Sequence, residues 1–191
     1  MSESVIYFRT MKESEILFEG KTLIYPTDTI WGIGCDARNI CAIDKVKAIK
    51  GRDNTKSLIV LVKDIVMLKN YVENIPQVAI DMILSSQEPT TIIYPHAKNL
   101  PITHLSFNNS IGIRIPDNDF LQNLFAEFPY PIVSTSANFS GKTSPTCFDD
   151  IDKEFLSKAD YVSTFGRNSK PTYNASSIYL IKEDNSLKKI R

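Results

Sequence analysis

The sequence predicts an α/β fold, a twisted open mixed sheet with flanking helices, and three observations lead to it. Short apolar runs rich in Val and Ile alternate with segments of helical periodicity. The C-terminal end instead holds strand-like segments in succession, which favours a mixed sheet over a purely parallel one. With 191 residues, 42% of them hydrophobic and 23% charged, the chain suits a single domain over residues 1–191.

Helices are predicted where apolar residues recur every three or four positions between capping and terminating residues. Gly20 ends the first helix, Asn39 caps the second, Gly51 ends the second and Pro76 begins the fourth. The predicted helices span residues 11–19, 40–50, 64–72, 76–85 and 117–128, and the second buries Ile40, Ile43, Val46 and Ile49. The acidic residues Asp149, Asp150, Asp152 and Glu154 are expected to start another helix and to complement its dipole, not to bind a metal.

Strands are predicted where β-branched and aliphatic residues run together until a Pro or a polar turn. They span residues 22–25, 57–62, 90–94, 110–115, 131–136, 160–164, 176–181 and 187–190. Pro26 ends the first strand, and the polar turn 27–29 follows it. Polar residues also follow the strand at 131–136. Because ligands of open α/β sheets bind where strand ends meet loops, we expect the functional site there.

Composition excludes several classes of protein. Twenty-two basic residues balance 22 acidic ones, which argues against a protein whose main role is to coat nucleic acid. Three cysteines without a CxxC pair, together with two histidines, do not make a structural zinc site. The N-terminus lacks the pattern of a signal peptide, and the longest aliphatic run, 58–62, is too short to cross a membrane. We therefore expect a cytoplasmic protein without a bound metal or a membrane partner.

The segment KGRDNTKS, residues 50–57, places three cations within seven residues beside a glycine. An arginine can bind an anion through two nitrogens, and lysines act as mobile point charges, so the segment suits a phosphate or carboxylate. A solvated basic helix end is the alternative. The segment is not a P-loop, because Thr55 stands where the second glycine should precede Lys56.

Two further segments carry polar groups suited to anions. STSANFSGKTS, residues 134–144, is rich in hydroxyl side chains and forms either an anion-binding nest or an ordinary turn-rich loop. It has no GxSxG motif, and His96 and His104 lie in segments typical of surface loops, so a nucleophilic serine is not favoured. Arg114 lies inside an apolar strand, where it must be exposed at an edge or paired with an anion, such as a carboxylate or phosphate ligand.

Together these segments resemble the YrdC-like family of threonylcarbamoyl-adenylate synthases. The matching segments are YPTDTIWGIGCD, KGRDNTKSLIVLV, SIGIRIP, STSANFSGKTSPT and SSIYLI, in this order over nearly the whole chain. The resemblance implies a YrdC-like fold of the short type with a concave basic site. It implies that L-threonine, bicarbonate and ATP give threonylcarbamoyl-adenylate and pyrophosphate, with Mg²⁺ carried by ATP. A separate transferase complex would then modify the adenosine beside the tRNA anticodon to t6A, and a contact with tRNA is expected.

The resemblance also assigns residues. Those expected to contact threonine are Thr29, Arg114, Ser134 and Ser176, with Arg114 binding the carboxylate. Those expected to face ATP or the adenylate are Lys50, Arg52, Lys56, Ser110, Ser136, Asn138, Ser144 and Arg191, and Lys50 and Arg52 are the expected catalytic residues.

Two other functions remain open at this point. A non-catalytic YrdC-like paralogue could bind RNA or a nucleotide through the basic stretch 45–56, although the neutral net charge counts against it. An enzyme that makes carbamoyl-adenylate from carbamoyl phosphate ranks last, because such domains usually belong to much larger chains.

Overall fold

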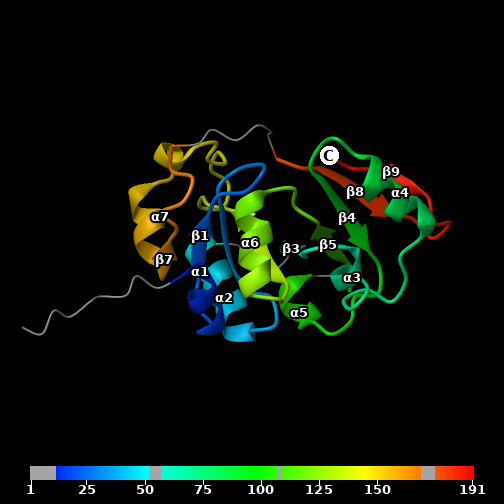
Figure 1. The fold of residues 1–191 in the computed structure, drawn as a ribbon, viewed down its shortest axis with the longest axis horizontal. Helices are drawn as coiled ribbons and strands as arrows, with labels where there is room; N and C mark the ends of the chain where they lie inside the picture. The colour runs from blue at the N-terminus through cyan, green and yellow to red at the C-terminus, as the bar shows by residue number, and fades with distance from the viewer. Residues whose placement is uncertain (1–11, 52–56, 107–108, 169–174) are drawn as a thin grey trace, which may run out of the picture.

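The structure is a computed structural model that describes residues 12–51, 57–106, 109–168 and 175–191. Its described part contains one nine-stranded sheet, in the order β7-β1-β2-β6-β3-β5-β4-β8-β9 (Figure 1). The strands are β1 Leu23–Tyr25, β2 Gly32–Asp36, β3 Ile59–Leu61, β4 Thr90–Tyr94, β5 Ile111–Arg114, β6 Ile132–Ser136, β7 Tyr161–Val162, β8 Ser177–Ile181 and β9 Leu187–Lys189. The pairs β1/β7, β3/β5 and β4/β8 are parallel and the other neighbours antiparallel, which confirms the predicted mixed sheet.

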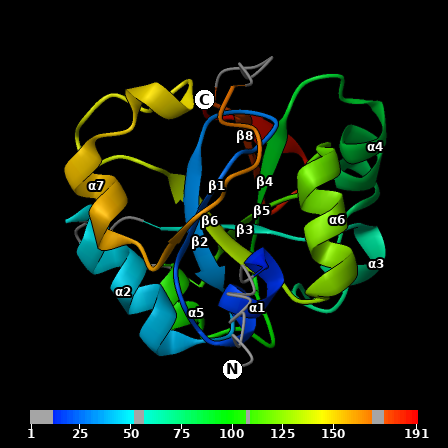
Figure 2. The ribbon, with the colours of Figure 1, turned by 60° about the vertical axis from the view of Figure 1, so that its left-hand side comes forward.

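Helices pack on both faces of this sheet (Figures 1 and 2). They are α1 Glu13–Phe18, α2 Ile40–Lys50, α3 Ile65–Leu68, α4 Gln77–Ser85, α5 Ile102–Leu105, α6 Asp119–Glu127 and α7 Lys153–Lys158, with a short 3₁₀ turn at Phe148–Asp150. The predicted ends of α2 are confirmed: the Asn39 side chain accepts a hydrogen bond from the Ala42 amide, and Gly51 adopts a left-handed conformation. The expected acidic helix start is confirmed at Asp152, whose side chain accepts from the Glu154 amide.

The alternation of side chains along the strands separates two apolar clusters. Leu23, Tyr25, Leu61 and Ile132 pack with α1 and α6 on one face. The intervening residues of the same strands face the other way and pack with α2, α5 and α7. In Figure 2, α2 and α7 lie on one side of β1, β2 and β6, and α6 lies on the other. Because both faces are covered, β3 is apolar without interruption, as the sequence predicted for 57–62.

Some elements differ from their prediction. Strand β2 was not predicted, because its sequence GIGCD has two glycines, which weaken strand propensity. Tertiary packing requires a glycine at position 34, because a Cβ there would lie 1.9 Å from the Val133 carbonyl oxygen of β6. The predicted helix 64–72 is only the single turn α3, and the prediction that Ile40 is buried is wrong, since that side chain at the first turn of α2 is 45% exposed. None of the described helices is long and apolar enough to cross a membrane.

Candidate active site

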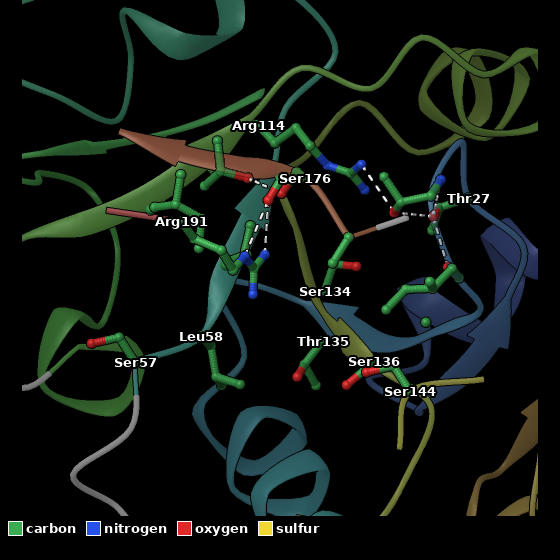
Figure 3. Close-up of a pocket in the computed structure, with 18 of the residues that line it drawn as sticks. Thr27, Ser57, Leu58, Arg114, Ser134, Thr135, Ser136, Ser144, Ser176 and Arg191 are labelled. Atoms are coloured by element: carbon green, nitrogen blue, oxygen red, sulfur yellow. Dashed lines mark hydrogen bonds between the residues drawn. The ribbon is translucent and has the colours of Figure 1, made fainter. Parts of the chain in front are cut away.

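A cavity of about 300 Å³ lies above the middle of the sheet (Figure 3). Its lining combines hydroxyl side chains, two arginines, aliphatic side chains and two strand glycines. These residues are Thr27, Thr29, Ile30, Gly32, Ser57, Leu58, Ile59, Thr91, Ile93, Ser110, Gly112, Arg114, Ser134, Thr135, Ser136, Ser144, Ala175, Ser176, Ile178 and Arg191. They come from six neighbouring strands, from residues next to the ends of strands, and from the loops at 27–30 and 144.

The sheet register brings the floor of the cavity together. Gly112 of β5 lies opposite Ile59 of β3, and Ile59 lies opposite Ser134 of β6. Two residues further along β5, Arg114 lies opposite Thr91 of β4. Residues paired in this way point to the same face, so a row of side chains that are polar or small, with Ile59 among them, crosses four strands. The site therefore uses a sheet face as well as the strand ends from which the sequence predicted it.

Arg114 is buried, with 5% of its surface exposed. Of the two alternatives for this residue, an exposed edge or an anionic partner, the structure shows the second. Its Nη1 donates to Asp28 Oδ1 at 3.0 Å and to Thr29 Oγ1 at 3.2 Å. Within the described residues, Nη2 and Nε have no hydrogen-bond partner, so part of the guanidinium fork is available to a ligand that enters the cavity.

The Asp28 carboxylate is the internal anion of the site. Burial raises the pKa of Asp28, and the positive charge of Arg114 opposes this rise. The pair was missed by sequence reasoning, although Asp28 stands in the polar turn of a segment already singled out. Part of the signal was available, because a buried arginine requires a partner and Asp28 is an acidic residue in a turn next to a strand. The pairing itself was not, because β2, β6 and β3 lie between β1 and β5 in the sheet.

We expect Arg114→Met to reduce stability more at neutral pH than in acid. Without the guanidinium, burial raises the folded pKa of Asp28 further above its unfolded value of about 3.9. The folded state then holds that proton more strongly, so the free energy of unfolding falls as the pH rises through the window between the two values. Urea unfolding at about pH 4 and about pH 7 measures the difference from the wild type. An equal difference at both values would contradict the ion pair.

Ser176 and Arg191 are joined by two hydrogen bonds in the cavity wall (Figure 3). Arg191 donates from Nε and Nη2 to the Ser176 carbonyl oxygen at 3.2 and 3.0 Å, while Ser176 Oγ lies 2.7 Å from Thr91 Oγ1. The amides of Ile190 and Arg191 both bond to the carbonyl of Ile178, so two residues oppose one. This bulge alters the alternation at the end of the strand pair, which places Arg191 at the cavity while Ile190 is exposed.

Thr27 and Thr29 form a hydroxyl pair at the entry loop. Thr27 Oγ1 donates to the Ile30 carbonyl at 2.7 Å and lies 2.8 Å from Thr29 Oγ1. Since the hydroxyl proton of Thr27 is used in this way, Thr29 donates to Thr27 and accepts from Arg114. Thr27 and Thr91 were missed by sequence reasoning; Thr91, in an apolar strand, carried no signal of its own.

The residues that the sequence predicted for the site are placed as follows. The described ones that line the cavity are Thr29, Ser110, Arg114, Ser134, Ser136, Ser144, Ser176 and Arg191. Lys50 and Asn138 are not among the lining residues of the described chain, although both donate to the main-chain carbonyl of Ser136, which does line it. Arg52 and Lys56 lie outside the described residues. Arg114 and Arg191 are the described arginines of the cavity, and the concave basic site stays a prediction.

Comparison with known proteins identifies the family. The model of the Sua5/YciO/YrdC family, described as telomere recombination, matches residues 15–191. The chain belongs to this family. Among the curated members, a protein of Methanocaldococcus jannaschii with the provisional name threonylcarbamoyl-AMP synthase is 39% identical over 181 residues, which cover 94% of this chain and 82% of the relative. The threonylcarbamoyl-AMP synthase of Pseudomonas aeruginosa is 30% identical over 156 residues, which cover 81% and 84%.

Solved structures confirm the YrdC-like fold. The P. abyssi Sua5 structure complexed with L-threonine superposes with a TM-score of 0.79 at 23% identity and 89% coverage of this chain. This chain spans about half the length of that Sua5 chain, since the match covers 50% of it. E. coli YciO superposes with a TM-score of 0.77 at 21% identity and covers 93% of this chain and 85% of its own.

Proposed function

We propose that this family member is a threonylcarbamoyl-AMP synthase, a nucleotidyltransferase that converts L-threonine, bicarbonate and ATP into threonylcarbamoyl-adenylate and pyrophosphate. The product serves the t6A modification of tRNA beside the anticodon. Synthases of this name match more than four fifths of their own length. One observation within the cavity carries the proposal: the buried Arg114 leaves part of its guanidinium open among hydroxyl side chains, as recognition of an amino-acid carboxylate requires.

The chemistry needs no activated side-chain nucleophile. The threonine amine attacks carbon dioxide, with loss of a proton, or bicarbonate, with loss of water, to form a carbamate. A carbamate oxygen then attacks the α-phosphorus of ATP, and pyrophosphate leaves. Neither histidine of the chain is a lining residue of the cavity, so the hydroxyls there have no adjacent imidazole base. Orientation of the three substrates and stabilisation of developing charge supply the catalysis.

The cavity divides between the substrates. Arg114, with Thr29 beside it, binds the threonine carboxylate, and Ser134 and Ser176 complete the threonine end. The ATP end contains Ser110, Ser136, Ser144 and Arg191. We assign Arg52 and Lys56 of the basic segment to the same substrate on the family resemblance alone. Mg²⁺ arrives with ATP, since it keeps several waters and binds phosphates in preference to a protein cage. A transferase complex takes up the product, and because its substrates include tRNA and ATP, we place the reaction in the cytoplasm.

The direct test is pyrophosphate release from Mg-ATP by the purified protein in bicarbonate buffer, with and without L-threonine. The synthase requires release that depends on threonine, together with an adenylate product of the mass of threonylcarbamoyl-AMP. A folded protein that releases no pyrophosphate under these conditions would overturn the proposal. Tight tRNA binding with steep salt dependence in that protein would instead support the non-catalytic paralogue.

A further inference from the structure

The ammonium group of Lys50 lies inside the protein, against the loop that follows β6. Lys50 is the last residue of α2, and only 3% of its surface is exposed. Its Nζ donates to the carbonyl oxygens of Ser136, at 2.5 Å, and Asn138, at 2.7 Å. The Asn138 Oδ1 lies 3.5 Å away on the same side. A buried ammonium therefore rests on oxygen atoms of a single short loop.

These contacts use the donors of the side chain. A lysine ammonium carries three N–H groups and no acceptor. The described acceptors around Nζ include two main-chain carbonyls and the Asn138 amide oxygen. A triphosphate would have to displace these carbonyl groups from the ammonium. The Asn138 carbonyl has no other donor among the described hydrogen bonds, whereas the Ser136 carbonyl also accepts from the Asn138 amide at 2.9 Å. A buried carbonyl left unpaired is costly.

The same loop is tied to α2 and to itself by further hydrogen bonds. The Ser140 amide donates to the main-chain carbonyl of Lys50 at 2.8 Å. Asn138 Nδ2 donates to the carbonyls of Lys142, at 2.6 Å, and Phe139, at 3.2 Å. The loop 136–142 is thus held at its start by the Lys50 ammonium and closed by the Asn138 amide. The segments that it joins supply Ser136 and Ser144 to the cavity.

We propose that Lys50 is a positioning residue that holds the loop 136–142 in place, and not a ligand of the ATP triphosphate. Lys50 of the segment 50–57 and Asn138 of the segment 134–144 then form one structural unit, which sets the position of Ser136 at the cavity. The statement about the loop stands on the contacts alone, and only the statement about ATP rests on the proposed function.

Hydrogen–deuterium exchange of the unliganded protein tests the first half. Lys50→Met keeps the length of the side chain but removes every donor, so the amides of 136–142 should exchange on the order of tenfold faster or more. The matched control is Lys47→Met, which removes a buried lysine one turn earlier in α2 that makes no side-chain hydrogen bond among the described residues. In Lys47→Met, the amides of 136–142 should exchange at the wild-type rate. Wild-type exchange of the loop in Lys50→Met would overturn the proposal.

Nucleotide affinity tests the second half. If Lys50 bound the triphosphate, it would contact the β- and γ-phosphates, which AMP lacks. Its replacement would then lower the affinity for ATP much more than the affinity for AMP. A displaced loop instead weakens both nucleotides, and the ratio of their dissociation constants should stay within about twofold of the wild type. A tenfold selective loss of ATP affinity, with the loop unchanged, would make Lys50 a phosphate ligand. A protein that binds neither nucleotide would count against the proposed function, while the exchange result would still decide the role of Lys50.

Lys50→Arg is a second variant, for use if Lys50→Met increases hydrogen exchange throughout the sheet and not only in the loop. The arginine keeps the positive charge but places a planar fork where a compact ammonium fits between two carbonyls. A positioning role predicts faster exchange of 136–142 in this variant while the strands of the sheet remain protected. Equal acceleration of exchange in the strands and in the loop of Lys50→Arg would overturn the proposal, because the lysine would then stabilise the whole fold and not this loop.

Discussion

Arg114→Met is expected to raise the threonine KM of pyrophosphate release by about 30-fold or more. Truncation of one member of a buried, hydrogen-bonded charge pair costs about 2–5 kcal/mol, and 1.4 kcal/mol is a factor of ten. The guanidinium is 5% exposed, so bulk water cannot replace the contact with the threonine carboxylate. Initial rates at saturating ATP, over a range of threonine concentrations, measure the effect. The ATP KM should change much less, because Arg114 lies at the threonine end of the cavity.

The control for this variant is Arg114→Lys. It keeps a positive charge beside Asp28 and so retains a partner for the buried carboxylate, but it loses the planar fork that contacts two oxygens at once. We expect an intermediate threonine KM and stability closer to the wild type than that of Arg114→Met. An unchanged threonine KM in both variants would remove the assignment of Arg114 to the carboxylate, whatever happens to stability.

Gly34→Ala is expected to destabilise the protein by about 3 kcal/mol or more, because overpacking against a rigid neighbour is costly. The added Cβ would lie 1.9 Å from the Val133 carbonyl oxygen and about 3 Å from the ring of Tyr25. The first obstacle is main chain of the adjacent strand, which cannot turn aside as a flexible side chain can. In a chain of this size the melting temperature should fall by roughly 10 °C, or the protein should fail to fold. Thermal unfolding followed by circular dichroism measures the change.

Gly112→Ala is the matched control, a glycine-to-alanine change in another strand of the same sheet. Its Cβ would meet Thr91 Cγ2 at 3.5 Å and Ile59 Cγ1 at 3.7 Å, which are ordinary contacts. Stability should therefore stay within about 1 kcal/mol of the wild type. Because Gly112 lines the cavity, the added methyl should still weaken substrate binding. A comparable loss of stability in the two variants would show that the close approach at Gly34 is not the cause.

Local signals in the chain predict most of the elements. The cap at Asn39 and the left-handed Gly51 bound α2 as expected, and strand β4 has the predicted limits. Strand β2 escaped prediction because its evidence is not local. Its glycines fit a strand only since β1 and β6 lie on either side of it and approach closely. The prediction that Ile40 is buried was wrong for a related reason. Helical periodicity gives the apolar face of α2 but not how far the sheet extends beneath its first turn.

The residues of the site likewise fall into those that the sequence could predict and those that only the fold revealed. Polar residues in an unexpected setting, such as Arg114 in an apolar strand or the hydroxyls of 134–144, could be recognised in the chain and do meet at one cavity. Thr91 could not, because a threonine in a β-branched strand is ordinary until the register places it opposite Arg114. The partner of Arg114 also depended on the fold, since Asp28 is 86 residues away.

The sequence by itself determined the class of fold, the family motifs and the types of side chain that an anionic substrate requires. These depend on composition, periodicity and spacing, which are properties of the linear chain. The tertiary structure decided which strand face became the floor of the cavity, which acid pairs with Arg114, and whether Lys50 faces the cavity or the loop behind it. Those outcomes depend on strand register and on the directions of long side chains across elements distant in sequence. Register selects one of two faces for every residue of a strand, and only packing selects the register.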